Sequence, residues 1–500
     1  MTDALSQSSE LCLEQFHKEY GRAPRVLHLG NIANNAYLNA RILNDLGFES
    51  HVLVSNYYHA MGWPEWEECS FETPIGDHFA PRFRPDANES WRRPSWFVQG
   101  PRELCRRLLV AMQTGAASER FWRRLLDTVL RFPRLRAARR FRGCELIGQA
   151  LRGDFRNWYR YLGRIVPFLG RTELEITSPT SRSIAESGLD IAECARREAE
   201  LAGWMGVLRY YDVVVGYATE GWVPLFAGIP YIAYEHGTIR KLPFETSTEG
   251  KLCAITYRRA DQVLITNCDN IDAAQRLGLT QYRFIPHPVN ERRKPNPELR
   301  GELVDRCQAE FLVFHPARQH WEEARDPSME KGNDIFLRGF SDFAKRARTR
   351  AGAILVNWGE TVDASKALID ELGIRDQVIW IEPQPHLAMS EYVVASDVVA
   401  DQFYLGAFGS ITPKAMFLER PVLLNLDKER HRWAFPELPP VCHASTPGEV
   451  TAQLERLEAD PEAAREIGIR GRRWYESWHS NRVVGNTLAE TITDTLRRRL

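Results

Sequence analysis

Two cationic side chains flank the loop between a predicted strand and a predicted helix. Arg318 follows the apolar stretch "FLVFH", and Lys331 with Gly332 comes just before the helix-like stretch "NDIFLRGF". A guanidinium and an ammonium that converge on strand ends would neutralise a diphosphate. The alternative is that both are solvated surface charges, which is the usual environment of a single Arg or Lys.

A glycine-bearing loop lies between two apolar runs in the segment "DQFYLGAFGSITPKAMFLERPVLL". Gly406 and Gly409 would let the backbone approach a ligand closely. Thr412 is the expected N-cap of the next helix and Pro413 its first residue, so free N–H groups would face an anion. An ordinary strand-to-helix turn is the alternative, because glycine loops are common. The expected anion-binding residues of this loop are Gly406, Gly409, Ser410, Thr412 and Lys414.

The elements that would position these residues alternate between strands and helices. "RVLHLG" and "SHVLVS" read as buried strands on either side of the helical stretch "NNAYLNARILNDLG". Further strands are expected at "YDVVVGY", "YIAYEH" and "DQVLITN", and a second series runs from "FLVFHPAR" to "PVLLNL". Repeated units of this kind give parallel sheets covered by helices. The predicted fold class is α/β, with two Rossmann-like, doubly wound domains in tandem.

The predicted domain boundaries follow this alternation. The first domain spans residues 1–285 and carries a helical insertion at about 57–203, where no clean strand is visible. The prolines of "YRFIPHPVN" suit a linker, after which the second domain spans residues 286–475. Residues 476–500 are expected to form a helix that packs back on the first domain. Ligands of open parallel sheets bind beyond the carboxyl ends of the strands, so the cleft between the domains is the expected site.

A basic and aromatic segment lies within the insertion. Residues 119–164 contain thirteen arginines and four acidic residues, interleaved with Phe, Trp and Tyr. Such a helical segment suits peripheral contact with a membrane, or an anionic acceptor such as a lipid diphosphate. Nucleic acid is not an expected partner, because no recognised nucleic-acid-binding fold is visible. The alternative is a helical subdomain whose arginines reach solvent from an aromatic core.

The composition is that of a soluble globular protein, with 44% hydrophobic and 26% charged residues among 500. The formal net charge of −1 gives no overall attraction to nucleic acid or membranes. Nine cysteines without a C-x-x-C pair argue against a disulfide framework and for a reducing compartment. The N-terminus lacks signal-peptide features, and no apolar stretch is long enough to span a bilayer. We therefore expect a cytoplasmic protein, which could lie at the inner face of the membrane.

The motifs resemble those of a known family. "ARQ" followed by "EKGND", then "GAFGSITPKAM" and "ERPVL", are similar to the donor-binding domain of GT-B glycosyltransferases, in particular the retaining group called family 4. The order of segments resembles that family from Arg25 to about Ser480, apart from the insertion. The resemblance implies that Arg318 and Lys331 hold the diphosphate of a nucleotide sugar. It also implies independence from metal ions, and the sequence has neither an H-x-x-x-H nor a D-x-D pair.

The sequence departs from this family at three positions. The two glutamates of its E-x7-E motif fall on Gly406 and Lys414, and Glu419 stands where a glycine usually precedes Pro-Val. A lysine donates hydrogen bonds but accepts none, so Lys414 cannot take over a glutamate's contact with the donor ribose. Asp401, at a strand end, is a candidate catalytic carboxylate in its place. Its alternative role is to cap the loop.

The first domain is expected to hold the acceptor. His236, at a strand end in "YEHGTIRKLPFE", is a candidate base or hydrogen-bonding partner of the transferring sugar, with Glu235 beside it. The family often has a histidine or an acid near this position. Amides suit sugar hydroxyls or a phosphate, and helix capping is the alternative for the asparagines. The expected acceptor-side residues are Gly30, Asn31, Asn34, Asn35, Arg240, Thr266 and Asn267.

The combined expectation is an enzyme that moves a hexose from a UDP- or GDP-linked sugar to a hydroxyl of a glycan or lipid-linked acceptor. By resemblance, it retains the anomeric configuration and acts in bacterial surface polysaccharide or glycolipid synthesis. No metal and no cofactor beyond the nucleotide-sugar co-substrate are expected. Two alternatives stay open: a non-catalytic GT-B protein that binds a glycan or a partner, and a sugar-nucleotide epimerase with the same two-domain fold.

Overall fold

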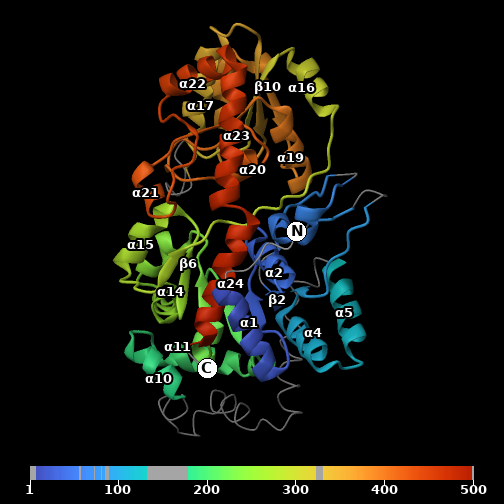
Figure 1. Ribbon diagram of the computed structural model, residues 1–500, viewed down its shortest axis with the longest axis vertical. Coiled ribbons are helices and arrows are strands. Elements are labelled where there is room, and N and C mark those ends of the chain that lie inside the picture. Colours follow the sequence, from blue (N-terminus) through green and yellow to red (C-terminus); the bar gives the residue numbers. More distant parts are fainter. Residues whose placement is uncertain are drawn as a thin grey trace.

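The computed structural model describes residues 7–55, 58–71, 74–79, 81–84, 89–131, 178–321 and 330–497. Two α/β domains lie one above the other, joined by a linker and by long C-terminal helices (Figure 1). Each domain is built on one parallel sheet, which confirms the predicted fold class of two tandem Rossmann-like domains. Most of the basic segment 119–164 falls in residues 132–177 and so lies outside the described residues.

The sheet of the first domain has seven strands in the order β3-β2-β1-β4-β5-β6-β7. Its strands are β1 (Arg25–Leu29), β2 (Glu49–Val54), β3 (Phe97–Gln99), β4 (Val213–Tyr217), β5 (Tyr231–Tyr234), β6 (Gln262–Ile265) and β7 (Tyr282–Phe284). The helices around it are α1 (Gln7–Tyr20), α2 (Asn35–Asp45), α3 (Pro64–Glu68), α4 (Arg102–Thr114), α5 (Glu119–Arg131), α10 (Pro179–Glu186), α11 (Ile191–Leu201), α12 (Met205–Leu208), α13 (Trp222–Ala227), α14 (Thr248–Arg259) and α15 (Ile271–Arg276). Short 3-10 turns, η2 (Thr238–Arg240) and η4 (Cys268–Asn270), follow β5 and β6.

The sheet of the second domain has six strands in the order β10-β9-β8-β11-β12-β13. Its strands are β8 (Phe311–His315), β9 (Ala351–Val356), β10 (Val378–Ile381), β11 (Val398–Ala400), β12 (Val422–Leu424) and β13 (Cys442–His443). Its helices are α16 (Leu299–Cys307), α17 (Asn333–Ala344), α18 (Val362–Leu372), α19 (His386–Ala395), α20 (Ile411–Phe417), α21 (Lys428–Arg432), α22 (Pro447–Ala459) and α23 (Pro461–Trp478).

Both faces of each sheet are buried, which explains why the strands read as continuous apolar runs. In β1, Leu27 and Leu29 belong to the core on one face, while Val26 belongs to the core on the other. The second domain repeats this pattern in β8, where Phe314 and Val313 face opposite cores. This layering places the carboxyl ends of the strands, and the loops that follow them, at one edge of each sheet.

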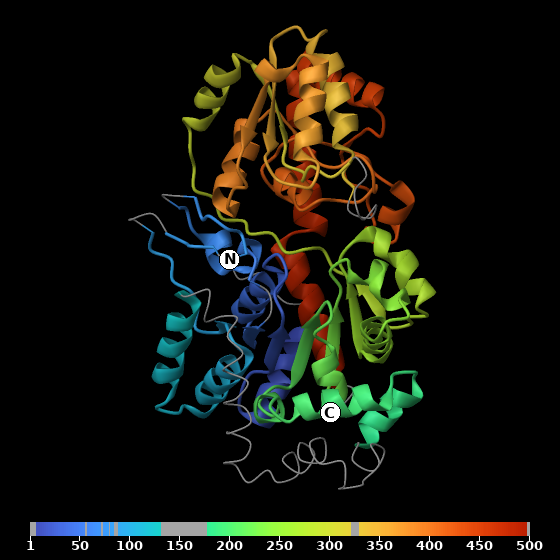
Figure 2. The same cartoon turned by 180° about the vertical axis from the view of Figure 1, so that it is seen from behind.

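The C-terminal helices cross from one domain to the other. α23 packs on α20 of the second domain, and α24 (Asn481–Arg497) packs on α1 and α2 of the first. Val484, Leu488 and Ile492 of α24 are buried in the same core cluster as Val26. Figure 2 shows the same crossing from behind, with α24 lying against the first sheet. The two domains are thus connected by the chain twice.

Besides the three-residue β7, which lies in a segment expected to be a linker, two further strands differ from the sequence expectation. β3 lies inside the segment where no strand was expected, and it pairs with β2 at the edge of the first sheet. β13 adds two residues to the edge of the second sheet. Both strands are too short to show a recognisable apolar period, so only pairing with a neighbour defines them.

Candidate functional site

The cationic pair of the second domain lies beyond the carboxyl end of β8. The Nζ of Lys331 donates a hydrogen bond of 2.6 Å to Oε1 of Gln402. Burial lowers the pKa of Lys331 to about 8. Among the surrounding charges, Asp401 raises this pKa, whereas Arg318 and Arg240 lower it. Lys331, Arg318 and Arg240, which come from two domains, therefore interact electrostatically beyond the end of β8. An anion bound there would reduce the repulsion between these three positive charges.

Arg318 lies where the two domains meet. Its guanidinium carbon is 5.3 Å from the ring centroid of Trp358, which follows β9. The other partner of Trp358 is His59 of the first domain, with ring centroids 6.3 Å apart and nearly parallel rings. The positive charge of Arg318 also lowers the pKa of His59, after the larger effect of burial. The guanidinium thus stacks on an aromatic ring at the domain border.

Asp401 is a buried carboxylate that holds the glycine-bearing loop. Its Oδ2 accepts hydrogen bonds of 2.6 Å from the backbone N–H of Gly409 and from the hydroxyl of Thr412. Burial raises the pKa of Asp401, and both hydrogen bonds oppose that shift. This geometry matches the alternative role of Asp401, in which its carboxylate caps the loop. The N–H of Gly409 is therefore already hydrogen-bonded inside the protein.

The predicted start of the next helix is wrong by two residues. Ser410 is the N-cap of α20, and Thr412 is the second residue of the helix. The Ser410 side chain makes no capping hydrogen bond. The carboxylate of Asp401, which comes from the end of a strand, contacts this turn instead, and sequence-local capping rules do not include such a contact.

Gly332, next to Lys331, and Gly406 in the glycine-bearing loop adopt left-handed backbone conformations. Gly332 has φ 66° and is the N-cap of α17, where an added Cβ would lie 3.1 Å from Cβ of Phe403. Gly406 has φ 71°, and its carbonyl accepts a 2.9 Å hydrogen bond from the backbone N–H of Asp427. Both positions favour glycine because an L-residue is strained there.

Lys414 contacts the interface between the domains. Its Nζ lies 2.5 Å from Nδ1 of His386, at the start of α19. The same Nδ1 lies 3.3 Å from the Glu67 carboxylate of α3, in the first domain. Burial lowers the pKa of Lys414 to about 8, and the negative charge of Glu67 opposes this shift. Lys414 therefore bonds to His386 of its own domain, and His386 makes the contact with Glu67 across the interface. The ammonium of Lys331, in contrast, bonds to Gln402.

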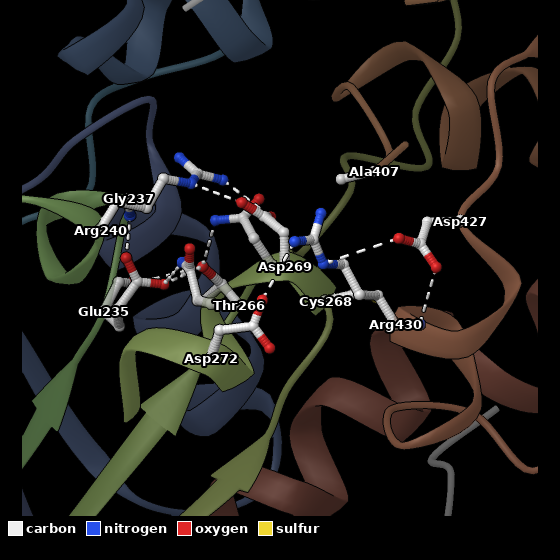
Figure 3. Close-up of polar contacts among 12 residues, drawn as sticks. Glu235, Gly237, Arg240, Thr266, Cys268, Asp269, Asp272, Ala407, Asp427 and Arg430 are labelled. Atoms are coloured by element: carbon white, nitrogen blue, oxygen red, sulfur yellow. Dashed lines mark hydrogen bonds and ion pairs between the residues drawn. The ribbon is translucent and has the colours of Figure 1, made fainter. Parts of the chain in front are cut away.

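Glu235 is fully buried beyond the end of β5 and connects two loops (Figure 3). Its Oε1 accepts the backbone N–H of Gly237. Its Oε2 accepts Nδ2 of Asn270 at 2.6 Å and the hydroxyl of Thr266 at 3.2 Å. Asn267 in turn donates to the Thr266 hydroxyl at 3.1 Å. Both oxygens of Glu235 are thus engaged within the protein, so its visible role is to position these loops.

His236 is held beside a second histidine. Its ring stands edge-on to His287 with centroids 5.1 Å apart, and Nδ1 of His287 lies 2.9 Å from Oδ1 of Asn35. Burial, with a smaller effect of Arg240, lowers the pKa of His236 to about 4. Within the described part of the chain, Nδ1 of His236 has no hydrogen-bond partner. A neutral imidazole of this kind is a weak base at neutral pH but a good hydrogen-bonding group.

Asn31 and Asn34, which follow β1, make hydrogen bonds that stabilise the loop between β1 and α2. Oδ1 of Asn31 accepts the backbone N–H of Tyr37 at 3.1 Å, which satisfies a donor in the first turn of α2. Nδ2 of Asn31 donates to Oδ1 of Asn34 at 2.9 Å, and Asn34 donates to the carbonyl of Trp63 at 2.8 Å. Gly30 has φ 88° and begins this turn. The geometry matches the helix-capping alternative for Asn31.

Charged contacts connect the first domain to α21 (Figure 3). Arg240 makes a two-pronged pair with Asp269, at 2.6 and 2.9 Å. Arg430 of the second domain lies 3.0 Å from Asp272 of the first and 3.6 Å from Asp427 of its own. The pair with Asp269 balances part of the charge of Arg240, and the pair with Asp272 connects Arg430 to the first domain.

Several residues of this region were not singled out from the sequence. Gln402 directly follows the predicted Asp401, and a polar residue at a strand end was the available signal. His386 and Glu67 come from different domains, so their meeting had no signal in the sequence. Asp269 was likewise hidden, because its partner Arg240 lies 29 residues away.

Within the described ranges, no cluster of three or more His, Cys, Asp or Glu side chains is arranged to hold a metal ion. None of the helices in the described part of the chain combines the length and apolar character that a membrane crossing requires.

No family model matches the chain, and a search of curated protein sequences finds no match. Among solved structures, it is similar to HepE of Anabaena in complex with UDP, with 17% identity and a TM-score of 0.48 over 59% of this chain and 82% of that one. It is also similar to sucrose-phosphate synthase from Thermosynechococcus elongatus, with 16% identity and a TM-score of 0.47 over 60% of this chain and 78% of that one. A third is WaaG, a glycosyltransferase involved in lipopolysaccharide biosynthesis, with 15% identity and a TM-score of 0.43 over 60% of this chain and 83% of that one. The fold assignment of this chain rests on the two sheets described above.

Proposed function

We propose that the protein is a glycosyltransferase that moves a hexose from a nucleotide diphosphate sugar to a hydroxyl acceptor. The observation that carries this proposal is the Lys331 ammonium beyond the carboxyl end of β8, with Arg318 following the same strand and Arg240 of the first domain close enough to lower the pKa of Lys331. Such charges stabilise the diphosphate that leaves when a glycosidic bond forms. WaaG is a glycosyltransferase, and structures of HepE are known in complexes with UDP and with UDP-glucose.

The reacting sugar is proposed to lie next to His236. Its unpartnered Nδ1 and low pKa make it a neutral hydrogen-bonding group for a sugar hydroxyl. Glu235 and Asn35 hold the surrounding loops and are positioning residues in this scheme. By resemblance to family 4, the anomeric configuration is proposed to be retained, which proton NMR of the first-formed product would reveal.

Isothermal titration calorimetry with UDP and GDP tests the donor site. We expect binding by the wild type and a loss of about tenfold or more for Arg318→Met and for Lys331→Met, since each removes a charged hydrogen bond to phosphate. Lys345→Met is the matched control, because its side chain lies 60% exposed just after the opposite end of α17. Absence of binding to both nucleotides at millimolar concentration would exclude the proposal.

A second candidate is a non-catalytic protein of the same fold that binds a glycan. It is favoured by the engagement of both candidate carboxylates, Asp401 and Glu235, within the protein. This candidate predicts binding without turnover. Incubation of the enzyme with UDP- or GDP-sugars, followed by proton NMR, separates it from a transferase and also from an epimerase, which would convert the sugar nucleotide without an acceptor.

The acceptor is proposed to be a glycan on a lipid carrier at a membrane surface. The motivating observation is α5, whose apolar residues Leu126, Val129 and Leu130 are buried while Arg120 and Arg124 are exposed. Such a basic surface helix favours an anionic bilayer. The proposed membrane contact also includes the basic residues of segment 119–164 that lie outside the described part of the chain.

A further inference from the structure

Gln402 connects the Lys331 ammonium to the glycine-bearing loop. Its side chain is buried directly after Asp401, with 2% of the residue exposed. Its Oε1 accepts the hydrogen bond from Nζ of Lys331 at 2.6 Å. Its Nε2 donates to the carbonyl of Ala407 at 2.5 Å. Both polar atoms of one amide are therefore used, one on the cation and one on the loop backbone.

The backbone around Gln402 is fixed as well. Its carbonyl accepts the N–H of Asn425 at 3.0 Å, which ties it to the residue after β12. The next residue, Phe403, donates its N–H to the carbonyl of Lys331 at 2.8 Å. The preceding Asp401 holds the other end of the loop at Gly409. The position of the ammonium and the shape of the loop are consequently coupled through one side chain.

We propose that Gln402 is a positioning residue that fixes the Lys331 ammonium at the diphosphate site while it holds the Ala407 carbonyl in place. This inference rests on the proposed function, because it assigns the anion at Lys331 to a nucleoside diphosphate. An ammonium has three donors, so a bond to Gln402 leaves two for phosphate oxygens. An amide is suited to both contacts, since a carboxylate would place an acceptor against the Ala407 carbonyl and a thioether would serve neither partner.

The charge of Lys331 gives this role a measurable signature. Asp401, Asp269, Arg318 and Arg240 are the charged groups in the described part of the chain that shift its pKa, and the positive charge of Lys331 in turn lowers the pKa of His320. Affinity for a diphosphate should fall as pH rises through the Lys331 pKa of about 8, because the neutral amine no longer attracts it.

Two replacements of Gln402 should shift the pH at which the affinity for a diphosphate falls, and they should shift it in opposite directions. Gln402→Met removes the acceptor of the ammonium and so shifts the loss of affinity to lower pH. Gln402→Glu places a negative charge beside the ammonium and shifts the loss to higher pH, while it weakens binding through repulsion of the phosphates. A purely structural role would lower affinity equally at every pH.

The experiment is calorimetric titration with UDP, GDP and uridine from about pH 7.5 to about pH 9, where the terminal phosphate is almost entirely ionised and the bases stay mostly neutral. We expect Gln402→Met to weaken diphosphate binding about five- to tenfold near pH 8 and to leave uridine binding unchanged. Gln453→Met is the control, since its amide donates to the carbonyl of His443 away from the cations. In a Lys331→Met background, Gln402→Met should cause no further loss.

The experiment distinguishes failure of the proposed function from failure of the positioning role of Gln402. If the wild type binds neither UDP nor GDP, the proposed function fails. If the wild type binds but the two Gln402 variants shift the pH dependence in the same direction or not at all, the positioning role is overturned. Should Gln402→Met not fold, as judged by thermal unfolding, Gln402→Glu alone decides the question through its shift to higher pH.

Discussion

At the scale of single residues, Gly406 shows why one motif glutamate is missing. Its φ of 71° is left-handed, and an added Cβ would lie 2.8 Å from Cβ of Asp427. Asp427 also caps α21, where its carboxylate accepts the N–H of Arg430. A glutamate at position 406 would therefore strain the backbone and displace the segment that contacts the first domain. The replacement fits a loop rebuilt around α21.

The contact of Gly406 with Asp427 predicts a specific loss of stability. Gly406→Ala should lower the free energy of unfolding by about 1–2 kcal/mol for its left-handed backbone and by about 1–3 kcal/mol more for the crowded Cβ. Gly373→Ala is the control, because Gly373 also has φ 71° but none of the described residues lies within 4 Å of an added Cβ. Urea unfolding followed by tryptophan fluorescence measures both, and equal losses would show that the contact is absent.

At the scale of elements, three helices from two domains meet through one polar cluster. Glu67 belongs to α3, His386 begins α19, and Lys414 lies in α20. Nζ of Lys414 lies 2.5 Å from Nδ1 of His386, which must accept because an ammonium has only donors. The carboxylate of Glu67 then balances the lysine charge from the other domain. Lys414 stands where the motif of the resembled family has its second glutamate. In this protein its side chain belongs to the polar cluster at the domain interface.

This cluster predicts a rise in stability at alkaline pH. The pKa of Lys414 is lowered from 10.5 to about 8 in the folded protein, so between these values the unfolded chain binds a proton that the folded chain does not. The free energy of unfolding of the wild type should therefore increase by about 1–3 kcal/mol between pH values of about 8 and 10.5. The reference is the double variant Glu67→Gln/Lys414→Met, in which neither position titrates. Urea unfolding at closely spaced pH values measures the difference between wild type and variant, and a difference that does not change with pH would contradict it.

At the scale of the whole molecule, the two sheets are connected by chain segments and by interface contacts. The linker after β7 and the α23–α24 crossing join the domains covalently, and the contacts of Arg430 with Asp272 and of His386 with Glu67 join their facing surfaces. The cations that shift the pKa of Lys331 belong to both domains, Arg318 to the second and Arg240 to the first. On the outside of the first domain, α5 presents arginines and the 59% exposed ring of Phe121.

The exposed face of α5 predicts binding to anionic membranes. Arg120→Gln/Arg124→Gln should weaken binding to vesicles that contain phosphatidylserine or phosphatidylglycerol about thirtyfold, as measured by co-sedimentation, since each arginine near the surface contributes about 1 kcal/mol. Arg346→Gln/Arg375→Gln is the matched control, with side chains 66% and 75% exposed on the second domain. Binding that is unchanged by the α5 replacements would remove this helix from the proposed membrane surface.

Much of the fold could be predicted because its signals are local. Apolar runs such as β1 and β8 are buried on both faces, so the sequence shows them directly as strands. Short edge strands such as β3 could not be seen, since pairing rather than composition defines them. The start of α20 was misplaced because the Thr412 hydroxyl bonds to Asp401 instead of capping the helix, and Ser410 is the N-cap without a side-chain hydrogen bond.

The sequence by itself determined the tandem α/β architecture and the position of Arg318 and Lys331 at strand ends, because both follow from the order of apolar and polar residues along the chain. Only the tertiary structure decided which polar groups remain available to a ligand. Asp401, Glu235 and Lys414 all find partners distant in sequence or in the other domain, and Gln402 gains its role from a lysine 71 residues away. Such partnerships depend on how the chain brings distant segments together, which no local pattern records.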